Sequence, residues 1–131
     1  MNYYYLDSSA ILKNVFFEKE SQALRGSLKG ELLTSEISRV EVVRRTLRLD
    51  DLLLENAHRA LRELTMLKIT SVTIIQAESL PPYISVRGLD AIHLASALSL
   101  NNPQLIFVAY DKELLKAAEK LGLKVLSPGA D

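Results

Sequence analysis

Four acidic residues occupy positions from which an alternating pattern of strands and helices can bring them together. Asp7 follows an aromatic, strand-like run and Asp111 follows a later apolar run. Glu41 and Asp90 lie early in helical patterns. Clustered carboxylates need a cation, and hard divalent ions such as Mg²⁺ are bound by a few carboxylates together with waters and substrate phosphate. Because a metal ion can activate water for attack on phosphorus, these acids predict phosphodiester chemistry.

Each acid also has an ordinary structural interpretation. Asp7 and Asp111 can be helix N-caps, and Glu41 can be a solvated charge. Asp90 can be a first-turn carboxylate favoured by the helix dipole. The functional interpretation is strongest for Asp90, because its helix is apolar on nearly all sides and an unpaired buried carboxylate is costly. His93, one turn further on, is interpreted as a structural side chain rather than as a site residue.

The elements that would position these acids follow from hydrophobic spacing. Strands are predicted at residues 3–6, 32–35, 105–109 and 123–126, with a strand or extended segment at 68–75. Helices are predicted at residues 36–49, 52–67, 89–98 and 111–121, with two helices or one kinked helix within 11–28. Val40, Val43 and Leu47 are expected to form the stripe of the helix at 36–49, with Glu41 turned away from it at the rim. Gly122 is expected to end the helix at 111–121 in a left-handed conformation.

This alternation predicts an α/β fold with a mostly parallel central sheet and helices on both faces. Right-handed crossovers place all strand-to-helix junctions at one edge of such a sheet, where ligands bind. Asp7, Glu41, Asp90 and Asp111 are therefore expected to converge in one cleft.

Length and composition agree with a single folded domain spanning residues 1–131. The absence of Cys excludes disulfides, thiolate metal sites and a cysteine nucleophile. The sequence has neither a signal-peptide pattern nor a membrane-spanning apolar run, so a cytoplasmic location without membrane association is expected. Sixteen basic residues balance sixteen acidic ones, so only a local cluster of charge can indicate binding to nucleic acid.

Such a cluster follows Glu41 on the predicted helix. Arg44, Arg45 and Arg48 lie three, four and seven positions after it, and Arg39 is close in sequence. Arginine forks here would hold RNA phosphates with a salt-dependent affinity and little sequence preference. The alternative is a solvated face paired with acidic residues at 50 and 51.

Four motifs in order resemble those of the PIN-domain family, in particular the VapC-type toxins of prokaryotic toxin-antitoxin pairs. They are residues 5–12 (YLDSSAIL), 38–44 (SRVEVVR), 88–95 (GLDAIHLA) and 109–114 (AYDKEL). The resemblance covers essentially the whole chain. It implies an endoribonuclease that depends on Mg²⁺ or Mn²⁺, forms a homodimer and is silenced by a bound antitoxin. The leucine-rich pattern of residues 52–67 is a candidate docking surface for that antitoxin, or else part of the core.

Carried over by position, the resemblance makes Asp7, Glu41, Asp90 and Asp111 the catalytic acids. Asp7, Asp90 and Asp111 would bind the metal, and Ser8 or Ser9 would assist through a hydroxyl at the substrate. Arg44 and Arg48 are added to the substrate contacts by the charge argument above and not by the resemblance. One position departs from the pattern, since Ala109 stands where the family often has Thr or Ser.

Three other functions remain open from the residues. A phosphotransferase could use Asp7 as nucleophile, but Ser9 stands where such enzymes usually need a second Asp. A catalytically degenerate PIN-like module could bind RNA or protein without cleaving, although all four acids are present. A Rossmann-type nucleotide site is disfavoured, because no glycine-rich turn follows the first strand.

Overall fold

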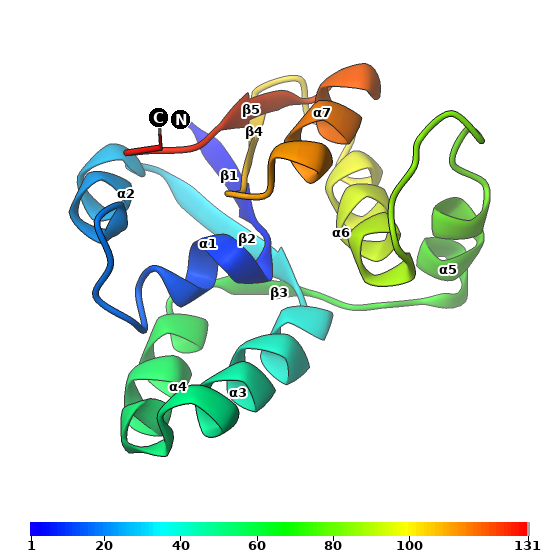
Figure 1. Ribbon diagram of the computed structural model, residues 1–131. Coiled ribbons are helices and arrows are strands. Elements are labelled where there is room, and N and C mark those ends of the chain that lie inside the picture. The colour runs from blue at the N-terminus through cyan, green and yellow to red at the C-terminus, as the bar shows by residue number, and fades with distance from the viewer. Residues whose placement is uncertain (131) are drawn as a thin grey trace.

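Five parallel strands form a single sheet in the computed structural model, which describes residues 1–130 (Figure 1). The strands are β1 (Tyr3–Leu6), β2 (Glu31–Ser35), β3 (Thr65–Leu67), β4 (Leu105–Val108) and β5 (Lys124–Leu126). Every neighbouring pair is parallel, and the spatial order is β3-β2-β1-β4-β5. The α/β fold with a parallel central sheet is therefore confirmed.

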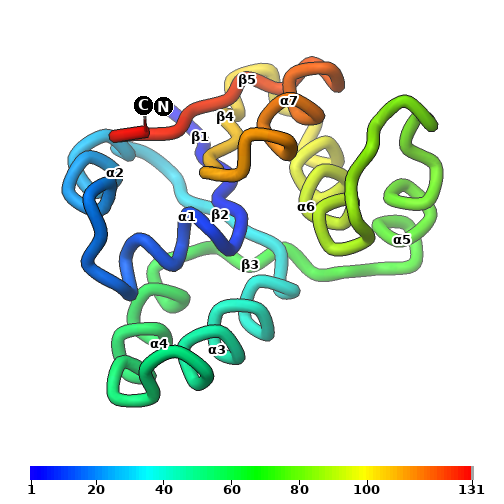
Figure 2. Tube along the Cα trace, viewed as in Figure 1, coloured from blue at the N-terminus to red at the C-terminus, as the bar shows by residue number. Residues whose placement is uncertain are grey.

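The chain path places β1 at the centre of this sheet. From β1 the chain moves outward through β2 to β3, and it then returns past β1 to β4 and β5 (Figure 2). The connections that follow β1 and β4 thus leave the sheet in opposite directions. In open α/β sheets a crevice forms outside the strand ends at such a reversal, and it is the usual place for a ligand.

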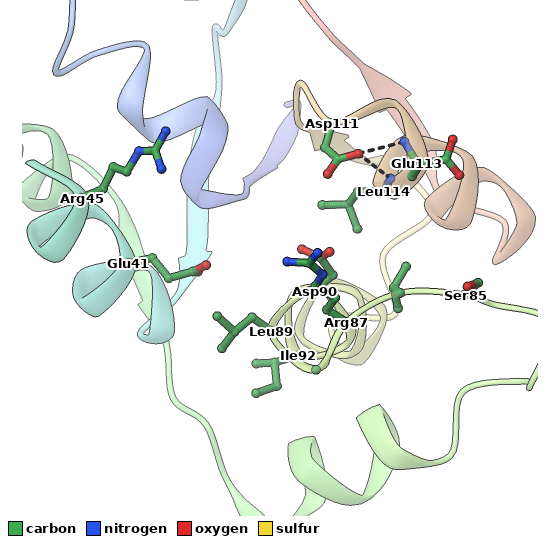
Figure 3. Close-up of a pocket in the computed structure, with 12 residues that line it drawn as sticks. Glu41, Arg45, Ser85, Arg87, Leu89, Asp90, Ile92, Asp111, Glu113 and Leu114 are labelled. Carbon is green, nitrogen blue, oxygen red and sulfur yellow. Dashed lines mark hydrogen bonds between the residues drawn. The ribbon is translucent and has the colours of Figure 1, made fainter. Parts of the chain in front are cut away.

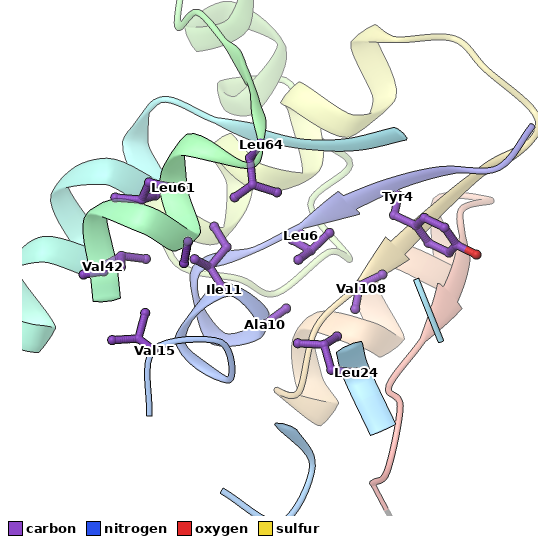
Figure 4. Packing of buried hydrophobic residues seen from close by; sticks show 12 residues of the cluster. Tyr4, Leu6, Ala10, Ile11, Val15, Leu24, Val42, Leu61, Leu64 and Val108 are labelled. Atoms are coloured by element: carbon purple, nitrogen blue, oxygen red, sulfur yellow. The ribbon is translucent and has the colours of Figure 1, made fainter. Parts of the chain in front are cut away.

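Helices cover both faces of the sheet. They are α1 (Ser8–Leu12), α2 (Ser21–Ser27), α3 (Ile37–Leu49), the 3₁₀ turn η1 (Asp51–Leu53), α4 (Leu54–Arg62), α5 (Ser71–Glu78), α6 (Gly88–Ser99) and α7 (Lys112–Lys120). The two hydrophobic clusters divide β1 by its pleat. Leu6 packs with α1, α3 and α4 on one face (Figure 4), whereas Tyr5 packs with α6 and α7 on the other.

Two predictions for residues 52–75 were wrong. The helix predicted at 52–67 ends at Arg62, because the chain at Thr65–Leu67 pairs in register with the end of β2. The extended segment predicted at 68–75 is mostly the helix α5. Its β-branched residues fold as a helix because Thr70 and Thr73 form a reciprocal capping box at its first turn.

The predicted buried stripe of α3 was wrong for Val40 and Leu47, whereas Val43 is partly buried against the core as predicted. Val40 is 60% exposed and Leu47 is exposed as well, while Ser38, Val42 and Thr46 are buried. The two hydroxyls tolerate burial because Ser38 bonds Thr34 at 2.7 Å and Thr46 donates to the α3 backbone at 2.8 Å. The helix α3 is therefore rotated about its axis relative to the prediction. As a result Glu41 lies next to the buried face of α3 rather than on the far side.

Two further expectations about the fold were right in part or in full. The helical region predicted within residues 11–28 contains two short helices rather than one kinked helix, although the first of them, α1, already begins at Ser8. Gly122 has a φ of 89° at the end of α7, as predicted. The leucine-rich face of α4 is intramolecular core, since Ala57, Ala60 and Leu61 are buried against β1 and α1. Among residues 1–130, no helix combines the length and apolar character needed to cross a membrane.

Candidate active site

Asp7 is the most deeply placed of the four acids. It follows β1 and caps α1, where its Oδ1 accepts from the Ala10 N–H at 3.0 Å and from the Ser9 hydroxyl at 2.7 Å. Its exposed fraction is only 4%. The Ser9 oxygen also accepts from the Tyr110 N–H at 3.2 Å, which ties the end of β1 to the segment after β4. Of the two predicted serines, Ser9 therefore contacts Asp7, whereas Ser8 opens α1 in a partly exposed position.

The other three acids line one cleft of about 1090 Å³ (Figure 3). Glu41 reaches into it from α3 and Asp90 from the first turn of α6. Asp111 is exposed and caps α7, its Oδ1 accepting from the backbone of Glu113 at 2.9 Å and of Leu114 at 3.3 Å. Asp111 is thus an N-cap that also lines the cleft, so the ordinary interpretation is confirmed and the functional one stays a prediction.

Like charges and burial act on these carboxylates together. Burial raises the pKa of Asp7 to about 6 from its ordinary 3.8, opposed by His93 and reinforced by the Glu41 charge. Burial also raises the pKa of Asp90, with the charges of Asp111 and Glu41 adding to it. The expected emphasis on Asp90 was therefore misplaced, because Asp90 is only partly buried while Asp7 is almost fully enclosed.

The donor set fits a hard cation that retains waters. In their present orientations, no three acidic or histidine side chains within residues 1–130 lie close enough to hold one ion. Within the same residues, the hydrogen bonds of Asp7, Glu41 and Asp111 each fall on a single carboxylate oxygen, Oδ1, Oε1 and Oδ1 respectively. Each side chain thus keeps a second oxygen as a ligand. Mg²⁺ needs only one or two carboxylates beside waters and substrate phosphate, so these residues suit it.

Arginines lie around the acids, and they include one, Arg87, that was not predicted. Arg45 on α3 and Arg87 before α6 line the cleft with the acids (Figure 3). Arg44 and Arg48 lie with Arg45 and Glu41 on an adjoining hollow of α3. In the described part of the chain, no ion pair joins these α3 arginines to Asp50 or Asp51, which weakens the solvated-face alternative. Arg87 was missed because it belongs to no helical stripe, and only its position three residues before Asp90 could have indicated it.

His93 takes part in the site through a bond that sequence spacing does not reveal. It is 1% exposed and therefore is not a direct substrate contact. Its Nε2 lies 2.7 Å from Glu41 Oε1, and its Nδ1 lies 2.7 Å from the Tyr5 hydroxyl. Interpreting His93 as a satisfied structural side chain was correct, but one of its partners is a predicted catalytic acid.

Comparison with known proteins agrees with this geometry. A family model described as PIN domain matches residues 4–120. Ribonuclease VapC46 of Mycobacterium tuberculosis is 37% identical over 126 residues, covering 95% of this chain and 96% of that protein. Ribonuclease VapC47 of the same species is 37% identical over 133 residues, covering 96% and 97%. A toxin-antitoxin complex from Klebsiella pneumoniae has a TM-score of 0.76 at 15% identity, covering 95% of this chain and 96% of that chain. With its motifs, fold and close relatives in agreement, this chain belongs to the PIN-domain family.

Proposed function

We propose that this protein is an endoribonuclease that hydrolyses RNA phosphodiester bonds with bound Mg²⁺ or Mn²⁺. The observation that carries the proposal is the gathering of Glu41, Asp90 and Asp111 from three separate helices around one cleft, at the reversal of strand order. Asp7 is not among the residues that line this cleft, but it lies close enough to Glu41 for the two charges to interact. Two curated relatives covering nearly the whole chain are named ribonucleases, which supports the same activity.

In this proposal Asp7, Asp90 and Asp111 would hold the cation, some of them through its bound waters, and Glu41 would complete the catalytic acids. A divalent ion supplies two things when bound, an activated water and neutralisation of charge on the phosphate. The protein contributes placement, because the hydrogen bonds from Ser9 and Ala10 fix the Asp7 carboxylate at the end of β1. Substrate phosphates are held by Arg45 and Arg87 within the cleft and by Arg44 and Arg48 beside it.

Ala109 does not leave the Asp111 end without polar support. The residue is fully buried, and its carbonyl accepts a hydrogen bond from the Ser127 hydroxyl. The adjacent Tyr110 N–H is satisfied by Ser9, which also donates to Asp7. Ser9 thus supplies a hydroxyl between the two strand ends, and we expect this to preserve activity despite the alanine.

We further propose that the protein is the toxin of a toxin-antitoxin pair and that a bound antitoxin controls it. The support is that the relatives carry the VapC name and that the Klebsiella pneumoniae neighbour is described as a toxin-antitoxin complex. Within the segment 52–67 predicted to receive the antitoxin, the apolar face of α4 is already buried in the chain, whereas Leu52 just before it is exposed. A homodimer remains part of the proposal.

The test is cleavage of a mixed RNA pool by purified protein, with Mg²⁺ or Mn²⁺ and with chelator. Asp7→Asn and Asp90→Asn should each abolish metal-dependent cleavage while retaining the folded circular dichroism spectrum. Wild-type RNA binding without cleavage in either metal would instead favour the degenerate binding module. Full activity in either variant would show that the nuclease belongs to a contaminant or to other residues.

A further inference from the structure

A buried chain of hydrogen bonds connects the sheet to the cleft. The Tyr5 hydroxyl of β1 lies 2.7 Å from His93 Nδ1 of α6, and His93 Nε2 lies 2.7 Å from Glu41 Oε1 of α3. Tyr5 and His93 are almost fully buried, whereas the Glu41 side chain is 22% exposed and faces the cleft. This series of hydrogen bonds therefore begins in the core at Tyr5 and ends at the proposed metal site at Glu41.

Which atom donates in each of these hydrogen bonds can be inferred from the Tyr5 hydroxyl. The Ser35 N–H of β2 donates to the Tyr5 oxygen at 3.2 Å, so the single phenolic proton is available for His93. A neutral imidazole has one donor and one acceptor nitrogen. In a neutral His93 whose Nδ1 accepts from Tyr5, Nε2 carries the ring proton and its N–H donates a hydrogen bond to Glu41. In this arrangement each buried polar side-chain atom of Tyr5 and His93 has a hydrogen-bond partner, as burial requires.

The imidazole is held in place by more than its hydrogen bonds. The Tyr5 ring stacks on Phe107 of β4, with ring centroids 5.4 Å apart and an interplanar angle of 6°. The same ring meets His93 edge-on at 5.8 Å and 74°. Two neighbouring strands thus fix Tyr5, Tyr5 fixes the plane and tautomer of His93, and His93 fixes one oxygen of Glu41.

We propose that His93 is a positioning residue that, supported by Tyr5, holds the Glu41 carboxylate with Oε1 occupied and Oε2 directed to a divalent cation or its bound water. The proposal rests on the function proposed above. It separates His93 from the four acids, because His93 touches neither substrate nor metal and acts only through Glu41. Hydrogen-bond partners of metal-site side chains commonly contribute about 10- to 100-fold to metal affinity.

The test is direct titration of Mn²⁺ into the full-length protein, followed by calorimetry or by the electron paramagnetic resonance of free Mn²⁺. His93→Leu fills the space without a donor and should weaken Mn²⁺ binding by about 10- to 100-fold. His93→Gln can donate an amide N–H to Glu41 and should recover most of that loss. Tyr5→Phe removes one atom and should weaken binding in the same direction. His58→Gln, at the other histidine, should leave the affinity unchanged.

A double-mutant cycle distinguishes action through Glu41 from a general loss of structure. If His93 works only by positioning that carboxylate, adding His93→Leu to Glu41→Gln should weaken Mn²⁺ binding little further. Equal losses in both backgrounds would assign His93 to the core alone and overturn the proposal. Unchanged affinity in both His93→Leu and Tyr5→Phe would overturn it too, while leaving the nuclease intact.

The outcomes also separate this proposal from the function on which it rests. If His93→Leu does not fold, Tyr5→Phe and His93→Gln decide the matter, since both preserve the size of the side chain. If the wild-type protein cleaves RNA in a metal-dependent way and the His93 and Tyr5 variants bind Mn²⁺ as tightly as wild type, only the role of His93 is overturned. A wild-type protein that neither binds Mn²⁺ nor cleaves RNA overturns both.

Discussion

The burial of Asp7 has a measurable cost in the metal-free protein. Its folded pKa of about 6 exceeds the ordinary 3.8, so the folded state holds the proton more tightly than the unfolded state does. A difference of about two in pKa corresponds to roughly 3 kcal/mol. The contribution of the Asp7 carboxyl to the free energy of unfolding is fully present below pH 3.8 and is lost as the pH rises from there through about 6. Above that pH it no longer changes.

Asp7→Asn removes the charge and keeps an oxygen that can accept from Ser9 and Ala10. We therefore expect the variant to be more stable than wild type by up to ~3 kcal/mol at neutral pH in chelator. At this chain length that corresponds to a rise of roughly 10 °C in melting temperature. Near pH 4 the two proteins should melt almost together.

Thermal unfolding of both proteins, followed by circular dichroism across this pH range at fixed ionic strength, measures the difference. Asp51→Asn, at an exposed acid on η1, is the matched control and should follow the wild-type pH dependence. A cation should reverse the cost, because free metal at a hundred times its Kd stabilises the fold by about 2.7 kcal/mol. Parallel pH curves for wild type and Asp7→Asn, with or without metal, would refute the reasoning.

Three other expectations concern the arginines, the glycines and the assembly. Arg44→Ala combined with Arg48→Ala should weaken RNA binding similarly across RNA sequences. The slope of log affinity against log salt concentration should fall by about one for each lost phosphate contact. An unchanged slope would mean that these arginines belong to a solvated face and do not contact RNA. Gly30→Ala should lower the free energy of unfolding by about 1–3 kcal/mol in urea titrations, because the new Cβ overlaps the Asn2 carbonyl, whereas Gly26→Ala in α2 has open space and should stabilise by up to ~1 kcal/mol. The proposed homodimer predicts twice the chain mass by light scattering, and a monomer at high concentration would contradict it.

Elements whose identity is local could be predicted from the sequence. The apolar run of β4, the capped α7 and the apolar α6 each carry their own signal. The strand β3 does not, because three residues become a strand only by pairing with β2. The rotation of α3 was equally hidden, since it depends on a hydroxyl pair between Thr34 and Ser38 that makes a polar face suitable for burial.

The acids of the site were predictable for a topological reason, and their surroundings were not. Parallel strands with right-handed crossovers direct their following residues to one edge, so Asp7 and Asp111 could be placed without knowing any packing. The bond from His93 to Glu41 joins residues 52 positions apart and depends on how α3 and α6 approach each other. Only the packed structure determines that approach.

The contact of Ser9 with Tyr110 also bears on when the site can exist during synthesis. It joins residues 101 positions apart, one beside the first strand and one after the fourth. A nascent chain on the ribosome can complete neither this contact nor the pairing of β1 with β4 until most of the sequence has emerged. The proposed nuclease should therefore be inactive on the ribosome until β4 and Tyr110 have emerged and can pack against β1 and Ser9.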